Sequence, residues 1–135
     1  MRIVLDTNSL IQSIPERSPY SIVWKSILSG ENTLCVSNEI LKEYTEIVQR
    51  LVGIDTASYI VDAILESKHI ELITPYYHFN LITADPDDNK FVDCAIAANA
   101  HYIVSNDKHF NILHSIPFPS VSVISLKNFA ETLIR

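Results

Sequence analysis

Two aspartates follow short apolar runs that are typical of buried β-strands. Asp6 comes directly after Ile3-Val4-Leu5, and Asp107 comes shortly after Tyr102-Ile103-Val104. In a parallel sheet the carboxyl ends of the strands meet at one edge, where ligands bind. We therefore expect the two carboxylates to lie within reach of each other. Aspartate is also a favoured helix N-cap, so each could instead cap the helix that follows its strand.

Two further acids lie on predicted helices, at positions where a charge needs an explanation. Glu43 falls just outside the apolar stripe of its helix, between Ile40 and Ile47 on neighbouring turns. Asp93 is the only charged side chain in the stretch 91–100, which is apolar on every face and is therefore predicted to be buried. A buried carboxylate must be compensated by a metal ion, a cation or hydrogen-bond donors. The alternative for Glu43 is a residue at the rim of the core that has no role in a site.

A short acidic segment precedes the helix that carries Asp93. Asp85 and Asp87 are typical of a solvated loop, whereas Asp88 lies at the predicted N-cap of the helix and is either a cap or a metal ligand. Asn89 lies one turn before Asp93 on the same helix face. It is therefore a candidate supporting residue.

Carboxylates gathered at one sheet edge would repel each other, and a divalent cation is the natural compensation. Mg²⁺ and Mn²⁺ take oxygen ligands and keep some of their waters. A carboxylate-held metal ion activates water and neutralises a phosphate, which is the chemistry of phosphodiester hydrolysis. The sequence has no CxxC motif and no Ser/His/Asp or Cys/His set. Covalent nucleophilic catalysis is therefore disfavoured.

The elements that would position these acids alternate in type along the chain. The predicted strands are 3–5, 33–36, 70–73, 102–104 and 121–124. The predicted helices lie between Ser18 and Gly30, from the N-cap Ser37 to Leu51, and at 56–67, 89–100, 108–114 and 126–134. The segment 75–88 is not assigned. This alternation predicts a single α/β domain, residues 1–135, with helices on both faces of a parallel sheet.

Composition excludes several classes of protein. The chain has 135 residues, of which 47% are hydrophobic, enough to bury the core of one domain. Its only glycines, Gly30 and Gly53, exclude a P-loop and a dinucleotide-binding turn. Cys35 and Cys94 lie in apolar stretches and are expected to be reduced core thiols. Because no signal peptide and no membrane-spanning run is visible, we expect a cytoplasmic protein.

Four segments of the sequence together resemble the PIN-domain family. They are Ile3-Val4-Leu5-Asp6-Thr7-Asn8, Ile40-Leu41-Lys42-Glu43-Tyr44, the stretch 88–97, and Ile103-Val104-Ser105-Asn106-Asp107. Each segment alone is weakly specific, but their order and spacing match along essentially the whole chain. The sequence is most similar to stand-alone PIN proteins of the VapC-like kind, the toxins of type II toxin–antitoxin pairs.

The resemblance implies a three-layer α/β/α fold with a central parallel sheet. It also implies an endoribonuclease that depends on Mg²⁺ or Mn²⁺, with one or two ions bound. Its implied partners are an RNA substrate, a second copy of the chain in a homodimer, and a small antitoxin that inhibits it.

The family's acidic positions fall on residues that the pattern alone singles out, namely Asp6, Glu43, Asp93 and Asp107. Either Asp93 or Asp88 is the third acid, and we favour Asp93 because leaving it buried and unpaired would be more costly. Glu43 would help to hold the metal or would orient the attacking water. Asn8 matches a polar position after the first acid, and Ser105 matches a small hydroxyl residue two positions before the last.

The acidity of the chain must be reconciled with a polyanionic substrate. Sixteen acids and ten bases give a net charge of −6, which is not the basic footprint of a nucleic-acid-binding protein. Much of that charge, however, belongs to the carboxylates of the expected metal site. Lys42 and Lys108 flank the motifs and are the candidate contacts to phosphate. Arg17, Lys90 and His109 also flank them, although a solvated surface charge is the ordinary state of such residues.

Three other functions fit less of the pattern. A phosphatase of the haloacid-dehalogenase type needs a second aspartate two residues after the first, where this chain has Asn8. A receiver-like phosphoacceptor needs paired acids after its first strand and a lysine after a late strand. A PIN scaffold that has lost catalysis and acts only as a protein- or RNA-binding module is the main alternative to the enzyme. The presence of all four acids argues against that loss.

Overall fold

Five short parallel strands form the centre of the protein, whose computed structural model describes residues 1–134. They are β1 (Arg2–Leu5), β2 (Thr33–Val36), β3 (Ile70–Leu72), β4 (Tyr102–Val104) and β5 (Val123–Ile124). Their order in the sheet is β3-β2-β1-β4-β5, and Leu5 pairs with Val104 at the end of the two central strands. The predicted parallel α/β architecture is confirmed.

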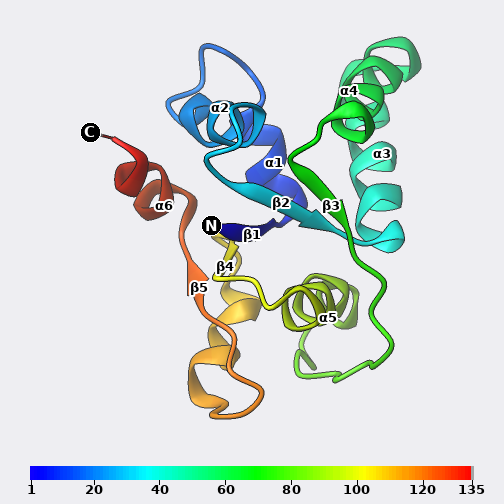
Figure 1. The fold of residues 1–135 in the computed structure, drawn as a ribbon. Helices are drawn as coiled ribbons and strands as arrows, with labels where there is room; N and C mark the ends of the chain where they lie inside the picture. The colour runs from blue at the N-terminus through cyan, green and yellow to red at the C-terminus, as the bar shows by residue number, and fades with distance from the viewer. Residues whose placement is uncertain (135) are drawn as a thin grey trace.

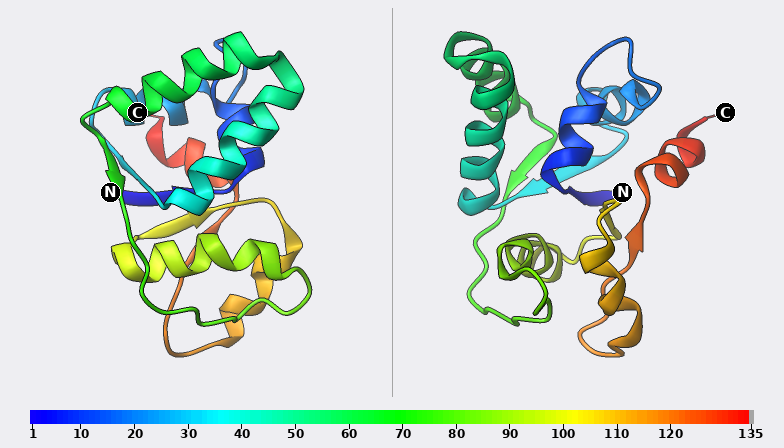
Figure 2. Two further views of the ribbon diagram at one scale, coloured as in Figure 1. Left: turned by 90° about the vertical axis from the view of Figure 1, so that its right-hand side faces the viewer. Right: turned by 180° about the vertical axis from the view of Figure 1, so that it is seen from behind.

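Helices cover both faces of this sheet and give the three layers α/β/α (Figures 1 and 2). One layer contains α1 (Thr7–Ser13), α2 (Ser21–Leu28), α3 (Asn38–Val52) and α4 (Ile54–Glu66). The other contains α5 (Asn89–Ala98) and the 3₁₀ segments η1 (Pro86–Asp88) and η2 (Lys108–Ser115). The last helix, α6 (Leu126–Leu133), packs against α2. No helix among residues 1–134 is long and apolar enough to span a membrane.

The order in which strands are added to the sheet reverses between β1 and β4. After β1 the chain passes along one face to β2 and β3, whereas after β4 it passes along the other face to β5. Ligands in open parallel sheets bind beside such a switch point, at the carboxyl ends of the strands. Asp6 and Asp107 follow the two strands that flank it.

The core is built from the strands and the helix faces turned toward them. The side chains of Ile3, Val4 and Leu5 are fully buried, as are those of Ile103 and Val104. Strands buried on both faces read as continuous apolar runs, which is why the sequence identified them. The acids at the ends of these strands are therefore carried on a rigid part of the fold.

Helix boundaries agree with the sequence where a side chain caps the helix. Ser37 is the N-cap of α3 and accepts a hydrogen bond from the amide of Ile40 at 3.2 Å. Gly53 ends the same helix with a φ of 86°, a conformation that glycine adopts without strain. The predicted cap Ser18 is wrong, because α2 begins at Ser21 and the Ser18 hydroxyl instead accepts from the amide of Tyr20.

The segment that the sequence left unassigned runs without regular structure from β3 to η1 along α5. Asn89 fixes it, since its side-chain amide accepts from the N–H of Ile82 and donates to the carbonyl of Ile82, both at 2.9 Å. The buried side chain of Asn89 thus pairs with the backbone of Ile82 in the way that a neighbouring strand would. This is a structural role for a residue that we expected to support the site.

Candidate active site

Asp6 lies where β1 ends and α1 begins, and its carboxylate is almost fully buried. One oxygen accepts from the amide of Ser9 at 2.8 Å, so Asp6 caps α1. The other accepts from the hydroxyl of Ser105, which follows β4. Burial raises the pKa of Asp6 above its usual value, and the nearby charge of Asp107 raises the pKa further. The chain therefore places a negative charge at the sheet edge at some cost in stability.

Asp107 lies on the neighbouring strand end and is connected to Asp6 through Ser105. Its backbone N–H donates to the Ser105 hydroxyl at 3.0 Å, and its carboxylate caps η2 by accepting from the amide of His109 at 2.9 Å. Asp6, Asn8 and Asp107 line one cavity of about 190 Å³ at this edge. Asp6 and Asp107 are therefore both helix N-caps, and they also lie close to each other. The two interpretations of the sequence, helix caps and neighbouring carboxylates, do not exclude each other.

Glu43 reaches the same edge from α3 and uses both of its oxygens. One accepts from the hydroxyl of Thr7, the residue after Asp6, and the other lies 2.8 Å from the ammonium group of Lys90 on α5. The next residue on α3, the fully buried Tyr44, donates its phenol to the carbonyl of Leu5 at 2.6 Å. Glu43 is therefore fixed to the end of β1 and to α5.

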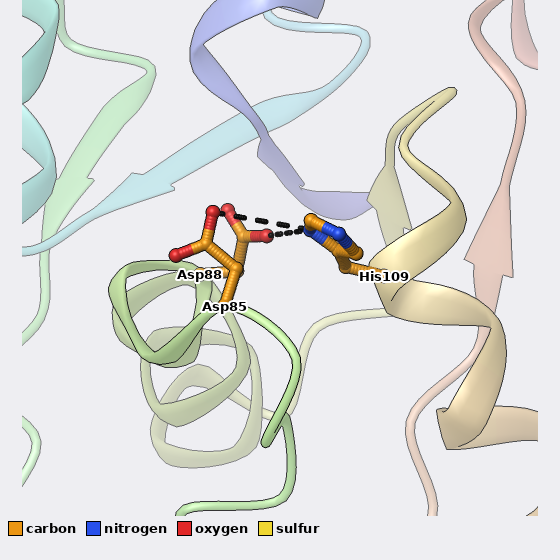
Figure 3. Close-up of side chains that lie close together, drawn as sticks. All are labelled: Asp85, Asp88 and His109. Atoms are coloured by element: carbon orange, nitrogen blue, oxygen red, sulfur yellow. Dashed lines mark hydrogen bonds and ion pairs between the residues drawn. The ribbon is translucent and has the colours of Figure 1, made fainter.

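Asp88 lies in a cluster with Asp85 and His109 (Figure 3), and Asp107 contacts the same histidine. The Nδ1 atom of His109 lies 3.2 Å from Asp88, 3.4 Å from Asp107 and 3.9 Å from Asp85. Burial raises the pKa of Asp88 to about 6; the hydrogen bond to His109 opposes this shift, and the charges of Asp107 and Asp85 add to it. Asp88 makes no side-chain capping hydrogen bond to α5, so its carboxylate is turned toward these neighbours.

Asp93 lies elsewhere on α5 and is only 4% exposed. One of its oxygens accepts from the amide of Phe79 at 3.1 Å, and the other lies 3.3 Å from Nδ1 of His78. The compensation that a buried carboxylate requires is therefore present within the protein. Asp93 lines a second cavity with Tyr76 and Tyr77, next to the segment that follows β3.

The structure thus brings Asp6, Ser105 and Asp107 together, with Asp88 and His109 beside Asp107. Of the two candidate phosphate contacts, Lys42 is exposed and lines a hollow with Glu43, and Lys108 is exposed directly after Asp107.

The sequence did not assign two basic residues to the places where the structure puts them. Lys90 is largely buried against Glu43, and His109, although partly exposed, contacts Asp88. The i,i+3 spacing of Asp87 and Lys90 in the sequence was the available signal for Lys90. The signal for His109 was its place two residues after Asp107, in the turn that Asp107 caps.

The donor set of the cluster fits a divalent cation. Asp85, Asp88 and His109 each offer a ligand atom, and these atoms lie within 4.8 Å of one another. Carboxylate oxygens suit Mg²⁺ and Mn²⁺, and imidazole nitrogen suits the transition metals. The Nδ1 atom of His109 lies within 4 Å of a carboxylate oxygen of each of Asp85, Asp88 and Asp107, so the ring nitrogen and the carboxylates face one another.

A match to a protein-family model identifies the family of this chain. The model of the PIN domain matches residues 2–109. The chain belongs to the PIN-domain family. The matched part of the PIN domain contains every acid of the sequence prediction, listed here in order: Asp6, Glu43, Asp88, Asp93 and Asp107.

Solved structures have the same fold as this PIN domain at low sequence identity. A chain in the crystal structure of VapBC2 from Rickettsia felis bound to promoter DNA matches with a TM-score of 0.66 and 20% identity, covering 93% of this chain and 98% of that one. A chain of VapBC-1 from nontypeable Haemophilus influenzae matches with a TM-score of 0.66 and 15% identity, over 94% and 99%. The PIN domain of human SMG5 matches with a TM-score of 0.59 and 10% identity, over 99% and 100%. No curated protein matches the sequence.

Proposed function

We propose that this PIN domain is a metal-dependent endoribonuclease whose active site lies at the carboxyl ends of β1 and β4. The observation that carries the proposal is the connection of Asp6 to Asp107 through the Ser105 hydroxyl, at the switch point of the sheet. A dense set of carboxylates at a place built for ligands is costly unless it holds a cation. Phosphodiester hydrolysis is the reaction for which such a set is suited.

Each acid has a role in this proposal. Asp6 and Asp107 would hold the metal ion, with Asp88 beside Asp107 as the third ligand that the geometry favours over Asp93. A bound Mg²⁺ or Mn²⁺ would neutralise the phosphate and lower the pKa of a water molecule. Glu43 would orient the attacking water or help to hold the metal, since two lone-pair sites on its oxygens remain beyond those used by Thr7 and Lys90.

Hydrolysis would be a direct displacement at phosphorus. The water oxygen bonds to phosphorus, the water proton passes to a carboxylate or to solvent, and the bridging oxygen leaves with a proton from solvent. Lys42 and Lys108, both exposed near the acids, would contact the flanking phosphates.

Single-stranded RNA is the substrate that the surface suits. Tyr76 and Tyr77 are 86% and 75% exposed beside the cavity that Asp93 lines. Exposed aromatic rings stack on unpaired bases without strong sequence preference. Both residues belong to the irregular segment between β3 and α5, whose path Figure 1 shows.

A role as the toxin of a toxin–antitoxin pair goes with this activity. The similar folds come from VapBC structures and from FitAB bound to DNA. Exposed apolar residues on α3 and α4 would suit a protein partner, either a second copy or a small antitoxin; among them Leu51, Ile54 and Tyr59 are 60%, 71% and 81% exposed. Light scattering of the purified chain tests the homodimer. Copurification with the product of a small adjacent reading frame tests the antitoxin.

Cleavage of fluorescent single-stranded RNA in Mn²⁺, Mg²⁺ or EDTA tests the enzyme, with single-stranded DNA of the same sequence beside it. We expect RNA cleavage that requires the metal and disappears in Asp107→Asn. A folded chain that binds no metal and cleaves neither substrate would instead favour the binding module. Cleavage that persists in EDTA would contradict the metal-dependent mechanism.

A further inference from the structure

Lys90 is placed unlike a solvated surface lysine. Its side chain is only 11% exposed, and its ammonium group lies 2.8 Å from Oε1 of Glu43 and donates to the carbonyl of Asp87 at 2.9 Å. Lysine is almost never buried to this extent unless it is paired. The residue lies in the first turn of α5, between the positions of Asp88 and Asp93.

The carboxylate of Glu43 is held at both ends. Lys90 binds one oxygen from α5, while the Thr7 hydroxyl binds the other from the first position of α1. Two contacts on different oxygens fix the plane of a carboxylate as well as its place. Thr7 follows Asp6 directly, so the plane of Glu43 is set relative to the strand end that carries the first acid.

We propose that Lys90 is a positioning residue, which holds the Glu43 carboxylate oriented to act on the attacking water instead of on the metal. This inference rests on the proposed ribonuclease function and specifies which of two roles Glu43 has. A carboxylate that already has an ammonium partner does not need a metal ion for its compensation. Asp85 and Asp88, by contrast, offer ligand atoms that lie with one of His109 within 4.8 Å of one another, close enough to hold one metal ion.

The consequence is a separation between the chemical step and metal binding. Preorganised groups act through their geometry, and a displacement of about 1 Å costs about 100-fold in rate. Removal of the ammonium group frees Glu43 to rotate about its own side-chain bonds. The rate at which bound RNA is cleaved should then fall, while the affinities for metal and for RNA are largely kept.

The test compares Lys90→Met with Lys90→Arg in the full chain. Lys25→Met is the matched control, because Lys25 is an exposed lysine on α2. The values of kcat and KM are measured on fluorescent single-stranded RNA in Mn²⁺. The dissociation constant of Mn²⁺ is measured by calorimetry on protein stripped with EDTA. Thermal melts in EDTA establish that each variant is folded.

We expect Lys90→Met to lower kcat about 100-fold, with KM and the Mn²⁺ dissociation constant both within about threefold of the wild type. Lys90→Arg should recover most of kcat, since it restores the cation. Thr7→Val removes the second contact to Glu43 and should also lower kcat while changing KM little. If Lys90→Met does not fold, this variant and Lys90→Arg still test whether the orientation of Glu43 controls kcat.

Three results would overturn the proposal. One is an unchanged kcat in Lys90→Met. Another is a weakened Mn²⁺ affinity or a raised KM with kcat kept, which would make Lys90 a residue of metal or substrate binding. The third is the absence of coupling between Glu43→Gln and Lys90→Met in a double-mutant cycle of unfolding, which needs no catalytic activity. A wild-type chain that cleaves no RNA while this coupling is present would refute the proposed function and the role in catalysis, but not the contact.

Discussion

The Ser105 hydroxyl donates a hydrogen bond to the carboxylate of Asp6 across the ends of two neighbouring strands. The same hydroxyl accepts the backbone N–H of Asp107 at 3.0 Å. One buried side chain thus fixes the distance between the two strand-end acids, and it lowers the cost of the Asp6 charge. Its position is as important for the site as the acids themselves.

Ser105→Ala should weaken both the fold and the activity. It leaves the buried Asp6 carboxylate without one donor, which typically costs about 1–3 kcal/mol. Because the Ser105 hydroxyl lowers the pKa of Asp6, its loss should raise that pKa and move the acid side of the pH–rate profile to higher pH. Denaturant unfolding and cleavage rates from pH 5 to 8 measure the two effects. Ser105→Thr, which keeps a hydroxyl, should retain more of both, and equal losses in the two variants would contradict this role.

Asp6→Asn should abolish cleavage without destabilising the protein. Burial raises the pKa of Asp6, so the ionised group is less favourable in the folded chain than in the unfolded one. At pH 7 the neutral amide removes that penalty while keeping the size of the side chain. A melting temperature equal to or above that of the wild type, with no metal-dependent cleavage, is the expected result. A clear fall in the melting temperature would mean that the two hydrogen bonds accepted by the Asp6 carboxylate, from Ser9 and Ser105, stabilise the fold by more than its burial costs.

The pH dependence of stability should reveal the burial of Asp88. Its pKa is about 6 in the folded chain, against 3.8 for the unperturbed group. Between pH 4 and 6 the unfolded chain therefore loses this proton first, and stability in EDTA falls as the pH rises. Asp88→Asn lacks this loss, so it should be the more stable protein at pH 7.5, by roughly 1–3 kcal/mol, and no more stable than the wild type at pH 4. The same difference at both pH values would show that Asp88 has an ordinary pKa.

The sequence predicted the elements whose signals are local. β1 and β4 are built on continuous apolar runs, and Ser37 caps α3 as expected because an N-cap needs only neighbouring residues. It assigned no residue range to α1, although it considered Asp6 as the cap of a helix after β1, because the seven residues of α1 are too few to show a periodic pattern. It placed the start of α2 too early because the turn at Ser18 has the same residue types as a helix cap.

The site was predicted as a list of acids but not as an arrangement. The parallel topology was enough to bring Asp6 and Asp107 to one edge. The partners of Asp93 and Glu43 depend on side-chain directions and on the irregular segment before α5, which no periodicity describes. Burial of Asp93 correctly implied compensation, yet the sequence could not show that His78 and Phe79 supply it.

The choice between Asp88 and Asp93 as the third ligand can be decided by the stabilisation that a bound ion provides. An ion at about 100 times its dissociation constant adds about 2.7 kcal/mol to stability, a rise of several degrees in Tm for a domain of this size. We expect Mn²⁺ to raise the Tm of the wild type relative to EDTA and to raise that of Asp93→Asn by a similar amount, because both Asp93 oxygens are engaged by His78 and Phe79. Asp88→Asn should lose most of the rise, since the carboxylates of Asp88 and Asp107 lie next to each other around Nδ1 of His109, at 3.2 and 3.4 Å. Each variant is compared with itself in EDTA, so a change in intrinsic stability does not affect the result. The opposite pattern, with the rise kept in Asp88→Asn and lost in Asp93→Asn, would make Asp93 the ligand and would require His78 to release it when the metal binds.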